Sequence, residues 1–144
     1  MTDSSQTSET PFDIIGGEKI LQVLVDRFYD LMDADPKWAH LRSLHSHDLE
    51  QSKQKLAWFL SGWLGGPNHY VERFGHPRLR MRHMHVAIGL QARDEWLQCM
   101  GQAMKDVGIT HDMQQRLMQS FFQTADWMRN QPEATRMEAF RPGD

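Results

Sequence analysis

Apolar side chains recur every three or four residues along most of this sequence, and that spacing is typical of one face of an α-helix. It predicts four main helices: one from Gly17 to just before Pro36, one from Asp48 to Leu64, one ending at Gly108, and one from about Thr110 toward Pro132. A shorter helical turn is expected over residues 37–44. No stretch alternates apolar and polar residues as a half-buried strand does, so the sequence predicts an all-α bundle.

The first of these helices has a broad apolar face. Leu21, Val25 and Phe28 mark its central stripe, and Leu24 and Leu31 widen it. A helix with so wide an apolar face is expected to pack against neighbours on two sides.

The length of 144 residues is enough for one domain with a core of its own. The first residues are polar and have almost nothing to bury, so we expect a disordered tail. The expected organisation is a disordered polar tail over 1–12, a folded domain over 13–131 and a C-terminal tail over 132–144.

Charge and cysteine content limit the possible partners and the compartment. The net charge of −3 argues against a protein whose main task is to grip nucleic acid. Cys99 is the single cysteine, and no charged start followed by an apolar run resembles a secretion signal, so a cytoplasmic location is expected. No apolar run approaches the roughly 20 residues that cross a bilayer.

The longest stretch without helical periodicity follows the "GGP" at Gly65 to Pro67, runs for about 22 residues to Gly89 and ends in "GHPRLRMRHMHVAIG". Long connections without regular structure inside compact domains are usually functional. His83 lies here among apolar neighbours, with arginines one step away. A haem group requires this combination, because its iron takes an imidazole ligand, its macrocycle is apolar and its two carboxylates attract cations.

Three polar side chains are expected to face the interior of the bundle. Ser52 interrupts the apolar stripe of the helix over 48–64, which leaves space there. Tyr29 and Trp96 lie on apolar stripes, and each brings a hydrogen-bond donor that needs a partner when it is buried.

Four strings of this sequence together resemble the group II truncated haemoglobins, which are small two-over-two helical globins. They are "VDRFYDLM", "LAWFLSGWLGGP", "YVERFGHPRLRMRH" and "ARDEWLQCM". The resemblance runs from about Gly16 to Asn130 and implies a truncated-globin two-over-two sandwich that binds haem b.

The resemblance also implies roles for individual residues. His83 matches the proximal iron ligand, while Tyr29 and Trp96 match the two main distal hydrogen-bond donors. Ser52 matches the small residue that replaces the distal histidine of ordinary globins, and Leu56 matches a distal wall position.

His45 matches a third polar distal position, with Leu44 or His47 as alternatives because the preceding loop is of uncertain register. The remaining cofactor contacts implied by the resemblance are Phe59, Lys55, Tyr70, Arg80, Arg82 and Met84. His85 departs from the family pattern just after the proximal ligand.

The function implied is binding of O2, CO and NO at a five-coordinate haem iron. Members of the family are associated with NO detoxification and with peroxidase-like activity, and either would need a reductase partner. A monomer or weak dimer is expected.

Three other interpretations remain open from the sequence. In one, zinc is held by four histidines: His69, His76, His83 and His85. In another, the domain is a haem-free helical interaction or sensor module, because a fold does not dictate a function. In the third, arginines form a nucleic-acid patch, an interpretation that the acidic balance disfavours: Arg73, Arg78, Arg80 and Arg82.

Overall fold

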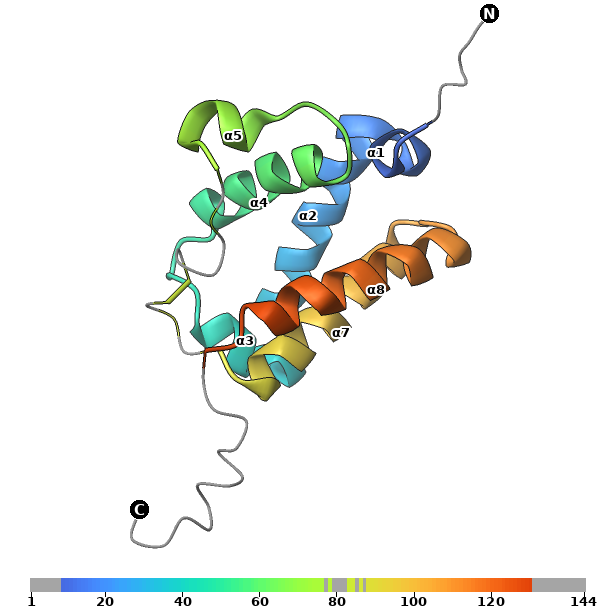
Figure 1. Ribbon diagram of the computed structural model, residues 1–144. Coiled ribbons are helices and arrows are strands. Elements are labelled where there is room, and N and C mark those ends of the chain that lie inside the picture. The colour runs from blue at the N-terminus through green and yellow to red at the C-terminus, as the bar shows by residue number, and fades with distance from the viewer. Residues whose placement is uncertain (1–8, 77, 79–82, 85, 87, 131–144) are drawn as a thin grey trace, which may run out of the picture.

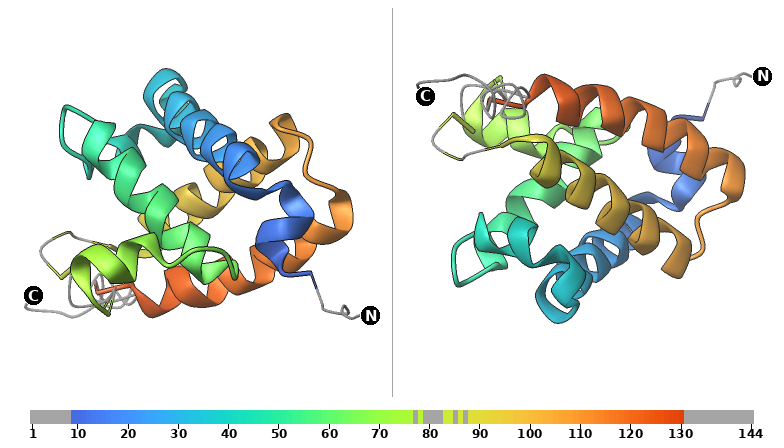
Figure 2. Two further views of the ribbon diagram at one scale, coloured as in Figure 1. Left: turned by 90° about the horizontal axis from the view of Figure 1, so that it is seen from above. Right: turned by 90° about the horizontal axis from the view of Figure 1, so that it is seen from below.

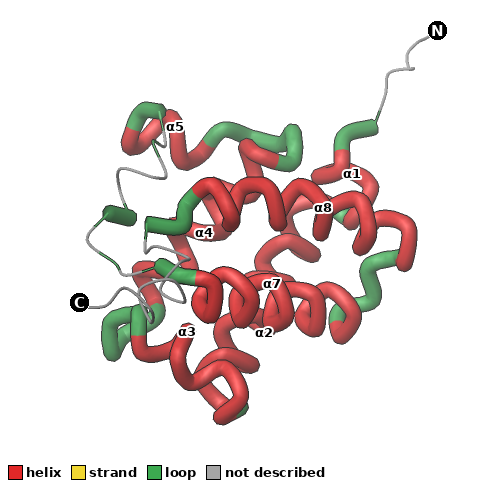
Figure 3. The backbone as a smooth tube through the Cα atoms, turned by 60° about the horizontal axis from the view of Figure 1, so that its bottom comes forward, coloured by secondary structure: helices red, strands yellow, loops and turns green. Residues whose placement is uncertain are grey.

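The computed structural model describes residues 9–76, 78, 83, 84, 86 and 88–130. Within these residues the chain is helical and has no strand, as Figure 3 shows. The elements are α1 (Pro11–Ile15), α2 (Gly17–Ala34), the 3-10 turn η1 (Pro36–Trp38), α3 (Ala39–Ser43), α4 (Glu50–Trp63), α5 (His69–Phe74), α7 (Leu90–Asp106) and α8 (His111–Trp127). The all-α prediction is therefore confirmed, as are the four main helices.

Two helix pairs form the framework. Helix α2 packs against α4, and α7 packs against α8. In Figure 1 α4 and α5 lie above α7 and α8, and the second view in Figure 2 shows α7 and α8 side by side. Helix α2 also packs against α7 and so joins the two pairs directly, which confirms that its apolar face has neighbours on two sides.

The core lies along α2 and α7. Leu24, Val25 and Phe28 of α2 are fully buried, and so are Met100 and Ala103 of α7. At about 25 cal/mol per Å² of apolar surface, burial of this kind is the main favourable term in folding. The stripe that predicts α2 from the sequence is therefore the stripe that holds the two pairs together.

Helix α1 begins at Pro11, two residues before the expected start of the domain at residue 13. Thr10 and Asp13 form a capping box, in which each side chain accepts a hydrogen bond from the other's backbone N–H. The Phe12 N–H donates to the Leu64 carbonyl at 3.0 Å, so α1 is fastened to the end of α4. Gly16, with φ of +119°, allows the turn from α1 into α2.

The segment of about 22 residues up to Gly89, predicted to be irregular, contains helix α5, so this part of the prediction is wrong. Tyr70 is the only residue of α5 that is buried, because it points toward the interior. A helix of six residues with one buried position is too short to show a period. None of the helices in the described part of the chain is long and apolar enough to span a membrane.

Candidate functional site

A cavity of about 590 Å³ lies between α2, α4, α7 and α8, in the range of volumes that cofactor sites occupy. Nine of the residues predicted from the sequence to form the site line it: Tyr29, His45, Ser52, Lys55, Leu56, Phe59, Tyr70, His83 and Trp96. These residues are far apart in the sequence, and the two helix pairs bring them to one space. A more open depression of about 530 Å³ lies on the outer side of α3 and contains ion-paired surface groups, so we place the site in the enclosed cavity.

One predicted cofactor contact does not line the cavity, and two others cannot be placed because they lie outside the described residues. The Met84 side chain is 54% exposed and does not line the cavity. Arg80 and Arg82 lie outside the described residues, as does His85.

His83 is half-buried and lines the cavity from the connection between α5 and α7. Its carbonyl accepts the Val86 N–H at 2.9 Å, which closes a turn, and the Asn130 side-chain amide at 3.2 Å. The histidine therefore approaches the cavity from a backbone that is held by hydrogen bonds.

Helices α2 and α4 bring polar groups to the cavity wall. Tyr29 is 5% exposed, and its hydroxyl donates to the Ser52 carbonyl over a long 3.5 Å. Burial, with a smaller contribution from Cys99, raises the pKa of the Tyr29 hydroxyl, so this group stays protonated and remains a donor at neutral pH.

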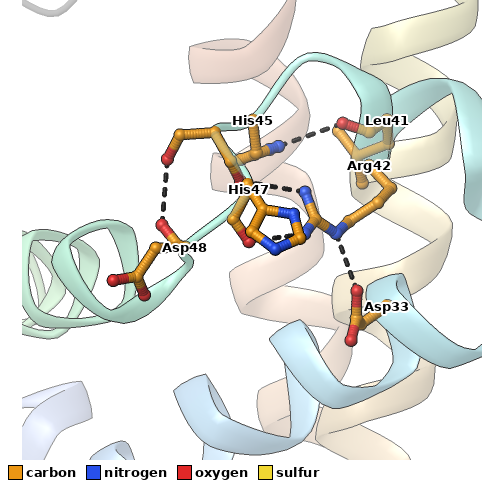
Figure 4. A network of polar contacts seen from close by, with 7 residues as sticks. Asp33, Leu41, Arg42, His45, His47 and Asp48 are labelled. Carbon is orange, nitrogen blue, oxygen red and sulfur yellow. Dashed lines mark hydrogen bonds and ion pairs between the residues drawn. The ribbon is translucent and has the colours of Figure 1, made fainter.

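His45 lies on the connection between α3 and α4, whose polar contacts are shown in Figure 4. Its side chain lines the cavity. Arg42 holds this connection by donating to Asp33 at 2.8 Å and to the carbonyls of Ser46 and His47 at 3.0 Å each. His45 Nδ1 bonds to the carbonyl of Leu41 at 3.0 Å. His45 therefore reaches the cavity as predicted, and Leu44 also lines it.

Burial lowers the pKa of His45, and the nearby charges of Arg42 and His83 add to this, while the bond to Leu41 opposes it. His45 is therefore neutral at neutral pH. Because a carbonyl can only accept, Nδ1 carries the proton and Nε2 carries a free lone pair.

Aromatic rings close the far end of the cavity. Trp96 meets Phe28 and Phe121 edge to face, at centroid distances of 5.3 and 5.4 Å. Trp63 stacks on Phe121 at 4.9 Å, and this contact joins α4 to α8 across the two pairs. A flat apolar group suits a space with such walls.

Several lining residues were missed in the sequence. They are Leu41, Ser46, Leu60, Trp63, Val86, Ile88, Ala92, Arg93, Phe121, Thr124, Ala125 and Met128. Most are apolar residues on the buried faces of helices. The sequence of a helix does not show where its apolar face stops packing in the core and begins to line the cavity. The α8 stripe is an example, since Leu117 is in the core and Ala125 is in the cavity wall.

The donor set fits a haem. The imidazoles of His83 and His45 both lie at a cavity whose walls are mostly apolar and aromatic, and His83 is the one expected to hold the iron. At the cavity wall Lys55 supplies a cation, whose Nζ lies 5.5 Å from the centre of the Phe74 ring. Among the described residues, no three side chains of histidine, cysteine, aspartate or glutamate are grouped to hold a bare metal ion.

Comparison with known proteins agrees with this geometry. Residues 10–130 match the bacterial-like globin family. The chain is 38% identical to the group 2 truncated hemoglobin YjbI of Bacillus subtilis, over 90% of this chain and 95% of that protein. The group II 2-on-2 hemoglobin of Agrobacterium tumefaciens superposes with a TM-score of 0.85 at 39% identity, over 90% of this chain and 100% of that one.

The chain belongs to the group II truncated haemoglobins. The cold-adapted truncated hemoglobin of Pseudoalteromonas haloplanktis TAC125 is also similar, with a TM-score of 0.83 and 40% identity over 86% of this chain and 100% of that one. The predicted two-over-two globin sandwich is thereby confirmed. Membership of the truncated haemoglobins implies a haem cofactor and haem-based binding of diatomic gases such as O2.

Proposed function

We propose that this truncated haemoglobin binds haem b through His83 and holds O2, CO or NO beside Tyr29, Trp96 and His45. When bound, the haem would supply an iron that can coordinate a diatomic gas. The observation that carries the proposal is that His83 and these three polar side chains line one apolar cavity.

The distal residues would supply both hydrogen-bond donors and a hydrogen-bond acceptor. The Tyr29 hydroxyl stays protonated and donates, the Trp96 indole N–H can only donate, and neutral His45 offers an acceptor. Ser52 leaves room at the remaining wall, and Leu56 and Phe59 exclude water. This set favours slow release of oxygen, and a truncated haemoglobin of Bacillus subtilis that superposes on this chain is described as oxygen-avid.

Slow release suits a reaction better than delivery, so we extend the proposal to oxidation of NO to nitrate, with peroxidase-like turnover as the second redox activity. One NO, one O2 and one electron give one nitrate, so each turnover needs an external reductase. A cytoplasmic location and a monomer or weak dimer complete the proposal.

Reconstitution with haemin tests the proposal. We expect an intense Soret band at one haem per chain, lost or altered in His83→Gly and restored by added imidazole. His76→Gly is the matched control, because His76 is exposed on the same connection and should leave the band unchanged. A chain that takes up no haem would overturn the proposal and favour a haem-free helical module.

A further inference from the structure

Four hydrogen bonds join Asn130 to described residues of the segment that contains His83. Its side-chain amide donates to the carbonyls of His83 at 3.2 Å and Val86 at 2.7 Å. Its side-chain oxygen accepts the Ile88 N–H at 2.8 Å, and its backbone N–H donates to the Ile88 carbonyl at 2.9 Å.

These bonds satisfy backbone groups of described residues that lie outside any helix. His83, Met84, Val86 and Ile88, which are described residues just before α7, lie in no helix, so their backbone groups need partners elsewhere. A side chain from 42 to 47 positions further along the chain supplies three of them. The backbone of the histidine segment is thus tied to the residues that follow α8.

The end of α8, from which Asn130 extends, is itself held in place. The Asp126 carboxylate near the end of α8 accepts hydrogen bonds from Arg93 of α7 and from Arg129, both at 2.7 Å. Arg93 also lines the cavity. Asn130 therefore projects from a point that is fixed to α7, and it links the His83 segment to a rigid part of the domain.

We propose that Asn130 is a positioning residue for the proximal histidine, a role that rests on the proposed haem ligation by His83. The amide fixes the position of the His83 backbone, and with it the approach of the imidazole to the cavity. Without the amide, the segment would keep the turn between His83 and Val86 but would be attached to the residues after α8 only by the backbone bond between Asn130 and Ile88.

Two substitutions at Asn130 separate the contribution of its side-chain NH2 group from that of its side-chain oxygen. Asn130→Ala removes all three side-chain bonds, while the backbone bond to Ile88 remains. Asn130→Asp keeps an acceptor for the Ile88 N–H but places a carboxylate oxygen against the carbonyls of His83 and Val86, which repel it. Gln123→Glu on the exposed side of α8 is the control for an amide-to-carboxylate change.

The first measurement is the iron–histidine stretching band of the ferrous protein, by resonance Raman spectroscopy, together with the rate of haem loss to an excess of apomyoglobin. We expect both Asn130 variants to shift or broaden the band and to lose haem about ten-fold faster or more, the size expected for the loss of two hydrogen bonds in Asn130→Asp and three in Asn130→Ala. Gln123→Glu should match the parent protein.

The second measurement is hydrogen exchange at the Ile88 amide, which can be followed with or without haem. Protection should be lost in Asn130→Ala and kept in Asn130→Asp. An unshifted iron–histidine band in both variants would overturn the proposal, even if their thermal stability fell. If the parent protein bound no haem, the proposed function would fail, while the exchange pattern would still report whether the amide holds the segment.

Discussion

The rings of Tyr29 and His45 meet edge to face, with centroids 5.8 Å apart and planes at 84°. One residue comes from the middle of α2 and the other from the connection after α3, so the contact sets one corner of the cavity. The two differ in hydrogen-bonding character, because Tyr29 donates while the free Nε2 of neutral His45 accepts.

Replacing Tyr29 by Phe removes the donor and keeps the ring. We expect oxygen to dissociate about ten- to a hundred-fold faster, because a hydrogen bond to a partly charged acceptor contributes about 1.5–3 kcal/mol. Stopped-flow measurement of oxygen release checks this. Tyr70→Phe is the matched control, since Tyr70 is the other tyrosine and also lines the cavity. Unchanged release in Tyr29→Phe would remove Tyr29 from the distal network.

Glu95 caps α3 from another helix. Its carboxylate accepts the Leu41 N–H at 3.0 Å and the Gln91 amide at 2.9 Å, and the N-cap residue of α3 provides no side-chain bond. Glu95→Leu should lower the free energy of unfolding by about 1–3 kcal/mol, because a buried N–H loses its partner. Glu95→Gln keeps an acceptor and should cost less. Urea unfolding of both variants measures the difference, and equal losses would contradict the capping role.

Arg42 holds the connection that carries His45. Arg42→Met should lower the free energy of unfolding by about 1–2 kcal/mol, because a half-buried guanidinium loses bonds to two carbonyls and to Asp33. Asp33→Asn removes only the ion pair, whose carboxylate is largely exposed, and should have a small effect. A double-mutant cycle by urea unfolding separates the two contributions, and equal effects of the single changes would show that the carbonyl bonds contribute nothing.

Acid should weaken the link between α7 and α8. Hydrogen bonds from Arg93 and then from Arg129 lower the pKa of Asp126 below its usual value of 3.8. Because the folded state binds this proton less readily than the unfolded state, the stabilisation is complete above that value and is lost as the pH falls through the lowered folded-state pKa. Asp126→Asn should therefore flatten the fall in unfolding free energy below about pH 4. A parallel fall in parent and variant would contradict this.

The helices could be predicted because their signal is local. In α2, Leu21, Val25 and Phe28 recur with the helical period, and all three are buried in the structure. The site residues were identified differently, since the resemblance to the truncated haemoglobins supplied the positions of Tyr29, His83 and Trp96, which all line the cavity.

The features that could not be predicted from the sequence depend on contacts between segments that are far apart in it. Asn130 lies 47 residues from His83, and an asparagine after a helix has many possible partners. In the sequence, Glu95 cannot be told from a glutamate that faces solvent. Its bond to the Leu41 N–H exists because α3 packs against α7. Met84 shows the opposite case, because it follows His83 directly in the sequence, yet it is 54% exposed and does not line the cavity.

The stack of Trp63 on Phe121 and the edge contact of Trp96 place two of the five indoles of this protein in the cavity wall. An indole excited in the ultraviolet passes its energy to a porphyrin beside it instead of emitting light. Trp127, 68% exposed at the end of α8, lies outside the wall. The fluorescence of the two indoles in the cavity wall should therefore fall as the cavity takes up porphyrin, so the fraction of protein that has bound it can be measured without an added label.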